Sequence, residues 1–298
     1  MSTGELFAGS SEEEAPRPAD PGRCIFVGTS GYSFADWVGP FYPPGTRPGD
    51  FLTFYARHFE TVEVNSTYYR VPSPIAIEKM VRKTPPGFRF MVKVNQAMTH
   101  ERSLESSLVG SFRAALEPLK AAGKYEGLLA QFPWRFRRTR ENESHLAALR
   151  GSLAGEPLFV EFRHASWALP DMPERLRDRN LGFCAVDEPA LAGLMPPVAW
   201  VTAADAYVRF HGRNAANWWG SRPPAAAAAA PRGSATATGD RYDYDYRAEE
   251  LKEWVERVRE MAGQARRTYL FFNNCHAGHA ASSARLMQEL LRQQGLPV

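Results

Sequence analysis

The chain has 298 residues, of which 44% are hydrophobic and 12% aromatic, and its formal net charge is +3 at pH 7. This length suits one large α/β barrel or two ordinary domains, and so small a charge excludes a uniformly basic surface for nucleic acid, so any basic surface has to be local. The three cysteines are widely spaced, and neither an apolar run of about 18 residues nor a basic-then-apolar leader occurs, so we expect a soluble, cytoplasmic protein without disulfides or contact with a membrane.

A polar tail opens the chain, because residues 1–22 combine an acidic run with prolines and have too little apolar surface to bury. From residue 23 to 298, strand-like and amphipathic segments alternate, and we interpret this span as one domain. The predicted strands are 24–28, 61–65, 89–94, 127–132, 158–163, 182–186, 206–211 and 269–273. The predicted helices are 50–59, 74–83, 104–122, 141–153, 173–179, 247–263 and 280–292.

Residues 221–240 interrupt this alternation with two prolines, six consecutive alanines and a run of Thr, Ala and Gly. Six alanines are far fewer than the roughly 12–15 residues that an isolated helix needs to persist in water. We therefore interpret 221–240 as a flexible loop insertion within the domain.

Strand–helix alternation repeated about eight times predicts a parallel sheet with crossover helices. The length fits a (β/α)₈ TIM barrel, which typically has about 250 residues. An open doubly wound sheet is the alternative, but no Gly-rich phosphate-binding turn follows the first predicted strand.

Polar residues stand at or near the carboxyl ends of the predicted strands, where the active sites of such barrels lie. Alternation along each strand allows most of them to point inward together. They are Glu63, Asn65, Lys93, Gln131, Glu161, Arg163, Asp187, Arg209, His211 and Asn273.

Several long motifs resemble the domain-of-unknown-function 72 family of YecE-like proteins. The matching stretches are 28–37, 39–43, 59–72, 90–93, 128–133, 160–167, 209–213 and 271–274. The resemblance covers residues 24–294 and implies a TIM barrel broadly similar to metal-dependent sugar isomerase and endonuclease barrels. It implies no particular reaction, and the tail and the insertion depart from it.

Four of the polar residues could carry catalysis, or together hold a divalent metal ion such as Mg²⁺, Mn²⁺ or Zn²⁺. They are Glu63, Glu161, Asp187 and His211. Cations at the same mouth would neutralise these carboxylates much as a metal would, so a buried salt-bridge network is the competing interpretation. His100 is a further acid–base candidate near neutral pH.

A set of cations with neighbouring amide and aromatic side chains predicts a site for an anionic substrate. Arg offers a planar fork that matches phosphate or carboxylate, and aromatic rings can stack sugars or bases. The candidate binding residues are Tyr32, Trp37, Asn65, Tyr69, Lys93, Gln131, Arg163, Arg209, Arg213, Asn273 and Asn274. Tyr68, Trp167, Trp218 and Trp219 extend the aromatic set, although ordinary loop packing accounts for part of it.

Our leading hypothesis is a TIM-barrel enzyme that acts on a phosphate-bearing or polyol substrate, with nucleic acid as one such substrate. In it Glu63 or Glu161 is the base, His211 is the acid–base partner, and the reaction is hydrolysis of the phosphodiesterase or nuclease type, or isomerisation. A non-catalytic binding module for nucleic acid or an anionic metabolite is a second hypothesis. A metal-dependent sugar isomerase or epimerase is a third.

Overall fold

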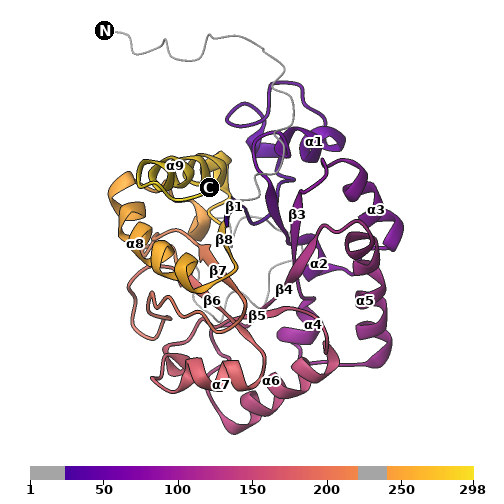
Figure 1. Ribbon diagram of the computed structural model, residues 1–298, viewed down its shortest axis with the longest axis vertical. Helices are drawn as coiled ribbons and strands as arrows, with labels where there is room; N and C mark the ends of the chain where they lie inside the picture. The colour runs from indigo at the N-terminus through magenta and orange to yellow at the C-terminus, as the bar shows by residue number, and fades with distance from the viewer. Residues whose placement is uncertain (1–23, 221–239) are drawn as a thin grey trace.

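Eight parallel strands form the centre of the molecule. The computed structural model describes residues 24–220 and 240–298, so the predicted tail at 1–22 and all but the last residue of the predicted insertion at 221–240 lie outside the described residues. The strands are β1 (Ile25–Thr29), β2 (Thr61–Val64), β3 (Arg89–Lys93), β4 (Tyr125–Gln131), β5 (Leu158–Glu161), β6 (Gly182–Asp187), β7 (Asp205–Phe210) and β8 (Arg267–Phe272). They pair in the order β1-β8-β7-β6-β5-β4-β3-β2, and a bridge between Ser30 and Glu63 joins the two ends of this sheet. The ring is therefore nearly closed (Figure 1), and the predicted (β/α)₈ barrel is confirmed.

Helices surround this ring (Figure 1). They are α1 (Phe51–Tyr55), α2 (Ser66–Tyr69), α3 (Pro74–Arg82), α4 (Gln96–Thr99), α5 (Ser106–Ala121), α6 (Arg140–Ser152), α7 (Met172–Asp178), α8 (Ala248–Gln264) and α9 (His279–Gln293). The helix predicted at 50–59 is limited to α1, and the sequence does not predict the single-turn helices α2 and α4. Between β6 and β7, residues 188–204 form no helix.

Two of the predicted helices, α3 and α6, begin at a side chain that caps the first turn. Ser73 caps α3 by accepting a hydrogen bond from the amide of Ala76, and Pro74 occupies the first turn, where its missing N–H costs nothing. Thr139 caps α6 in the same way, through the amide of Asn142. These caps satisfy backbone groups that a helix end leaves without partners.

The apolar core has two layers, one between strands and helices and one inside the barrel. The inner layer is Phe26, Met91, Leu129, Phe159, Cys184, Tyr207, Tyr269 and Phe271. Because side chains alternate along a strand, residues two and four positions further on also point inward, toward the carboxyl ends of the strands. The alternation along each strand therefore determines which of the polar strand-end residues come together inside the barrel.

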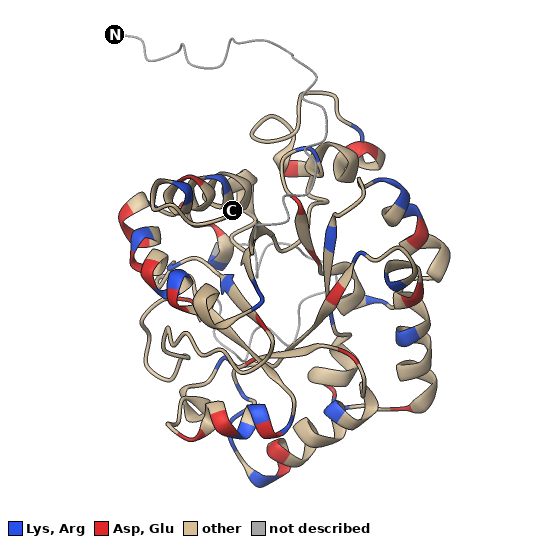
Figure 2. Cartoon of the chain, viewed as in Figure 1, with Lys and Arg blue, Asp and Glu red and all other residues tan. Residues whose placement is uncertain are grey.

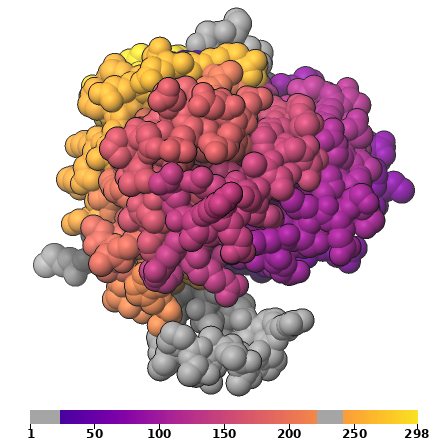
Figure 3. All heavy atoms as spheres, turned by 90° about the horizontal axis from the view of Figure 1, so that it is seen from below, coloured from indigo at the N-terminus to yellow at the C-terminus, as the bar shows by residue number. Residues whose placement is uncertain are grey.

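The chain runs around the barrel in sequence order. Figure 3 shows the middle of the chain, in magenta and red, between the yellow C-terminal helices on one side and the purple N-terminal third on the other. Most charged residues lie on the surrounding helices, while several also lie on the strands (Figure 2). None of the helices in the described ranges is long and apolar enough to cross a membrane.

Candidate functional site

A buried ion network fills the carboxyl end of the barrel, and Arg209 of β7 is its centre. The guanidinium donates to Glu63 of β2 at 2.7 Å and to Glu161 of β5 at 2.6 Å. It also donates to the hydroxyl of Ser30 at 3.2 Å. Arg209 is 1% exposed and both carboxylates are 0% exposed, so water cannot replace these partners. One cation therefore ties together three strands that are far apart in the sequence.

The remaining carboxylate oxygens of this network also have partners. The Tyr207 hydroxyl donates to Glu63 at 2.5 Å, and Arg163 donates through Nε to Glu161. Burial by itself would raise the pKa of Glu161, but Arg163 and Arg209 outweigh it and hold that pKa well below its usual range. Both carboxylates are thus already neutralised by arginine, as the competing interpretation of the sequence proposed.

His211 packs against this network as a neutral side chain. Burial and the nearby Arg163 keep its pKa well below the ordinary value. Its Nδ1 lies 3.1 Å from the Asn273 amide nitrogen and 3.4 Å from Arg163 Nη2, both of which are donors. Nδ1 therefore accepts and the ring proton sits on Nε2, which lies 3.2 Å from Glu161 Oε1. With 0% exposure, His211 positions its neighbours rather than meeting solvent.

A cavity of about 480 Å³ opens above the network at the mouth of the barrel. Its described lining residues are Tyr68, Tyr69, Lys93, Gln96, His100, Gln131, Pro133, Trp134, Arg163, Leu194, Trp218, Trp219, Arg241 and Tyr242. This set, which we call the mouth cavity, holds three cations and six aromatic rings, and it includes no carboxylate. Its volume is in the range that suits a small-molecule ligand.

Lys93 is a cation of the mouth cavity whose ammonium contacts an aromatic ring instead of a carboxylate. Its ammonium lies 4.2 Å from the centre of the Tyr68 ring, and among the described residues it has no hydrogen bond or ion pair. Burial among protein atoms, followed by repulsion from Arg209, lowers the pKa of Lys93 to about 7, because attraction to Glu63 and Glu161 offsets these effects only in part. The amine is thus close to half neutral at pH 7.

Glu188 is a member of the site that the sequence reasoning missed. Arg163 donates to it at 3.1 Å, the amide of Met195 donates at 3.0 Å, and its side chain is 1% exposed. Burial raises the pKa of Glu188 to about 7, more than Arg163 lowers it. Glu188 lies four residues beyond Cys184, which packs inside the barrel, so it has the inward parity of β6.

Asp187, in contrast, points out of the barrel, because it is three residues from the inward-facing Cys184. Its carboxylate accepts from the Tyr246 hydroxyl and the Trp254 indole, both at 2.6 Å, and from Arg213 at 2.7 Å. The structure therefore places Asp187 and Arg213 in a cluster that attaches α8 to the sheet, away from Glu63 and the other strand-end residues.

The other predicted residues divide between the cavity and the packing around it. Tyr69 and Gln131 line the mouth cavity. Trp37 is fully buried and donates to the carbonyl of Cys275 at 2.7 Å, while the Tyr32 carbonyl accepts from the Tyr42 hydroxyl. Asn274 donates to the Tyr244 carbonyl at 2.8 Å, and Trp167 stacks on Phe162. The Asn65 side-chain oxygen is buried without a hydrogen-bond partner among the described residues. Trp134, Gln96, Arg241 and Tyr242 belong to the mouth cavity without having been predicted.

The carboxylate and imidazole set does not form a ligand group for a metal ion. Within residues 24–220 and 240–298, no three or more His, Cys, Asp or Glu side chains are placed to hold one. The physical reason lies in the contacts above, since arginine occupies the oxygens of Glu63 and Glu161 and His211 is shared with Asn273.

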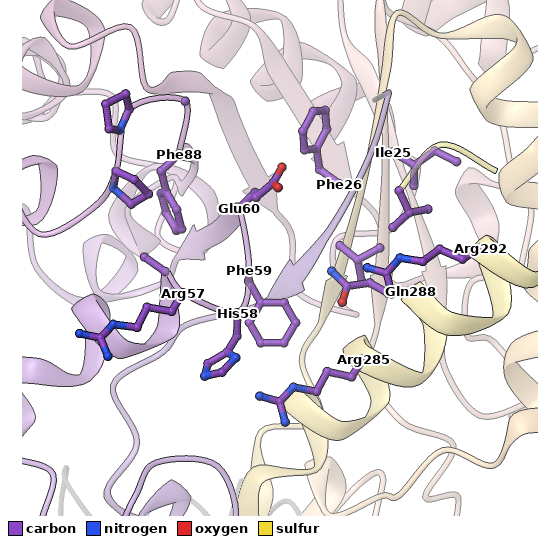
Figure 4. Close-up of a pocket in the computed structure, with 16 residues that line it drawn as sticks. Ile25, Phe26, Arg57, His58, Phe59, Glu60, Phe88, Arg285, Gln288 and Arg292 are labelled. Atoms are coloured by element: carbon purple, nitrogen blue, oxygen red, sulfur yellow. The ribbon is translucent and has the colours of Figure 1, made fainter. Parts of the chain in front are cut away.

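A second cavity, of about 230 Å³, lies at the opposite end of the barrel, where β1 and β2 begin. Figure 4 shows Arg57, His58 and Arg285 on one side of it, near Phe59, with Glu60 and Phe26 on the other. Active sites of eight-stranded α/β barrels lie at the carboxyl ends of the strands, so this end is the less suitable one for chemistry.

Fold and geometry together define a (β/α)₈ barrel with a cationic, aromatic cavity at its carboxyl mouth and a buried ion network beneath. The family described as "Protein of unknown function DUF72" matches residues 26–297, and the chain belongs to this family.

Relatives of known sequence and structure agree with this membership. The chain is 30% identical over 279 residues to the UPF0759 protein YunF of Bacillus subtilis (strain 168), covering 90% of this chain and 94% of that protein. It is 33% identical over 165 residues to the UPF0759 protein YecE of Escherichia coli (strain K12), covering 53% and 55%. A crystal structure of a DUF72 family protein from Thermotoga maritima MSB8 superposes with a TM-score of 0.79 at 39% identity, covering 90% of this chain and 99% of that one.

Proposed function

We propose that this protein is an enzyme that binds a small, phosphate-bearing substrate in the mouth cavity. The observation that carries the proposal is the make-up of the cavity wall, which combines Lys93, Arg163 and Arg241 with no carboxylate among the described lining residues. An anion entering this space meets positive charge on several sides and no like charge at the wall. In a space partly shielded from water, such an attraction is stronger than on an open surface.

The pairing of the charges supports an anion rather than a cation as the ligand. Arg163 is shared between Glu161, which remains ionised, and Glu188, which is close to half protonated at pH 7. Arg241 contacts the ring of Tyr242 at 5.2 Å and forms no ion pair within the described part of the chain. The cavity thus keeps positive charge that the neighbouring carboxylates Glu161 and Glu188 do not fully cancel.

The aromatic walls support a sugar or base as the other part of the substrate. Trp134 and Trp219 meet edge to face with their ring centres 5.2 Å apart, and Tyr68 and Tyr69 meet in the same way at 5.0 Å. Trp219 is 55% exposed and Tyr69 is 74% exposed, so both keep ring faces available to a ligand. Stacking on such faces contributes about 1–3 kcal/mol per base.

The test compares ligands that differ in one phosphate group. Thermal shift and calorimetric titration at pH 6 would use ribose 5-phosphate and a mononucleotide beside ribose and the matching nucleoside. A ligand at a hundred times its Kd stabilises the folded protein by about 2.7 kcal/mol. We expect the phosphates to stabilise and the neutral compounds not to, and equal effects of both would refute the anion site.

Matched variants locate the site. Arg241→Gln removes a cavity cation and should weaken phosphate binding at least about tenfold, since a charged hydrogen bond contributes about 1.5–3 kcal/mol. Lys79→Gln removes an exposed cation of α3 and should leave binding unchanged. Equal affinities of the two variants would place the anion elsewhere. A single-stranded oligonucleotide in the same panel tests whether the phosphate belongs to a nucleic acid.

A non-catalytic binding module is the second candidate, and one observation favours it. Glu63, Glu161 and His211, which the sequence suggests as the acid–base set, are 0% exposed and already have partners. A pure binder needs the cations and the rings alone. The discriminating measurement is turnover of a bound phosphate compound, followed by phosphorus and proton NMR, because a binder returns the ligand unchanged.

A further inference from the structure

We propose that Lys93 is a nucleophilic amine that forms an imine with the carbonyl carbon of an aldehyde or ketone held in the mouth cavity. This inference rests on the proposed function and narrows it, since the substrate becomes a phosphorylated carbonyl compound. It also supplies a reactive group for a site whose carboxylates are sealed away.

The position of Lys93 fits this role. It is the last residue of β3, on the inward parity of Met91, and it lines the mouth cavity. Its amine rests on the face of the Tyr68 ring at 4.2 Å and holds no hydrogen bond within the described ranges. An amine with free bonding directions can approach a ligand without first giving up a partner.

Lys124 shows what an ordinary buried lysine looks like in the same chain. Its ammonium donates to the carbonyl of Thr84 at 2.7 Å, to the hydroxyl of Thr84 at 2.9 Å and to the carbonyl of Val81 at 2.9 Å. All three of its protons are therefore donated to oxygen acceptors of the protein. Lys93 has no such acceptors around it.

Burial is the largest influence on the pKa of Lys93, and the charges that face the amine come from several strands. Arg209 of β7 and Arg163 beyond β5 repel a proton on the amine, while Glu63 of β2 and Glu161 of β5 attract one. These carboxylates are bonded to the arginines, so burial and repulsion prevail and the pKa falls to about 7. At pH 7 the neutral fraction is then on the order of a thousand times that of an exposed lysine.

His100, another titratable group that lines the same cavity, is uncharged at pH 7. Its ring packs edge to face on Tyr68 at 5.2 Å, and it lines the mouth cavity. Burial and the charge of Lys93 lower the pKa of His100 to about 4. A neutral imidazole can take up and release a proton in turn, and we assign His100 the transfer of protons between the amine and the carbonyl oxygen.

The reaction balances without any further reagent. The lone pair of Lys93 Nζ attacks the carbonyl carbon, and the oxygen takes up the proton that the nitrogen releases, which gives a carbinolamine. The C–O bond then breaks, the oxygen leaves as water with a second proton from the nitrogen, and a C=N bond remains. In its protonated form this bond draws electrons from the neighbouring C–H or C–C bond, as enzymatic isomerisation or carbon–carbon cleavage requires.

Reductive trapping on the full chain tests the inference. The protein is incubated with glyceraldehyde 3-phosphate and cyanoborohydride, whose hydride adds to the imine carbon and fixes the adduct as a secondary amine. Peptide mass spectrometry then compares Lys93 with two internal controls, the exposed Lys79 and the hydrogen-bonded Lys124. We expect Lys93 to be modified at least a hundred times faster than either, with a rate that rises with pH up to about 7 and then levels off.

The outcomes separate this inference from the anion site. Modification of Lys93 at the rate of Lys79, with phosphate binding intact, overturns the imine and leaves the proposed function standing. Fast modification by glyceraldehyde as well, without protection by inorganic phosphate, supports the reactive amine and overturns the anion site. The wild-type measurement needs no variant, and Lys93→Met, checked for folding by circular dichroism, should abolish the fast adduct.

Discussion

Arg209→Met is the substitution that tests the buried network most directly. It removes two charged hydrogen bonds, of 2.7 Å and 2.6 Å, and leaves Glu63 and Glu161 at 0% exposure. Breaking a buried ion pair by removing one partner costs about 3–5 kcal/mol. Because one cation here serves two acids, we expect at least the upper end of that range, a large share of the 5–15 kcal/mol that typically stabilises a domain.

The pH dependence of stability should weaken in this variant. In the native protein the pKa of Glu161 is lowered, so its contribution is present above the unfolded pKa and is lost as the pH falls through the folded pKa. Arg209→Met removes one of the two arginines that outweigh burial at Glu161, so the pKa of that carboxyl rises. Less stability is then lost as the pH falls.

Urea unfolding followed by tryptophan fluorescence at pH 3, 4, 5 and 7 measures both effects. The matched control is Arg82→Met, which removes an exposed pair with Glu78 whose side chains are 62% and 50% accessible. Exposed pairs of this kind contribute about 0–1 kcal/mol. A loss below about 1 kcal/mol in Arg209→Met, with a native pH profile, would refute the reasoning.

Three further predictions follow from the same contacts. Asp187→Asn should lower the free energy of unfolding by about 1–3 kcal/mol, since it weakens two buried hydrogen bonds and the partly buried contact with Arg213, yet calorimetry should find unchanged phosphate binding. Trp219→Ala should weaken binding of a mononucleotide by about 1–3 kcal/mol but change the urea midpoint little, because the ring is 55% exposed. Phosphate binding should tighten as the pH falls from 8 to 6, because Lys93, with a pKa of about 7, gains its charge in that interval, and a flat profile would contradict the role of Lys93.

The barrel itself could be predicted from sequence because its signals are local. Alternating apolar strands, capped helices and the overall length each point to the same repeat. The helices α2 and α4 could not be predicted in this way, since a single turn shows no periodicity. Residues 188–204 depart from the repeat in another way. They connect two parallel strands, a connection that normally contains a helix, but they form none.

The sequence did not predict which of Asp187 and Glu188 points into the barrel. Both faces of β6 are buried, so the strand reads as a continuous apolar run and carries no alternation to say which residues point inward. The packing of Cys184 inside the barrel shows which side chains of β6 point inward. It places Glu188, rather than the predicted Asp187, at the candidate site. The pairing of Arg209 with both Glu63 and Glu161 was equally out of reach, because it depends on three strands meeting across a closed ring.

The sealed network and the reactive amine are two consequences of one charge balance. Glu63 and Glu161 match Arg209 and Arg163 in number, so the buried layer is close to neutral and can exist at 0–9% side-chain exposure. Lys93 stands directly above as a third cation, and Glu188, whose pKa is about 7, is bound to Arg163 rather than to the amine. An amine without an acid of its own sheds its proton more easily. The network occupies the oxygens of Glu63 and Glu161, so these carboxylates are not available as catalytic bases. The same network leaves Lys93 without a carboxylate partner, which favours the neutral, nucleophilic form of its amine.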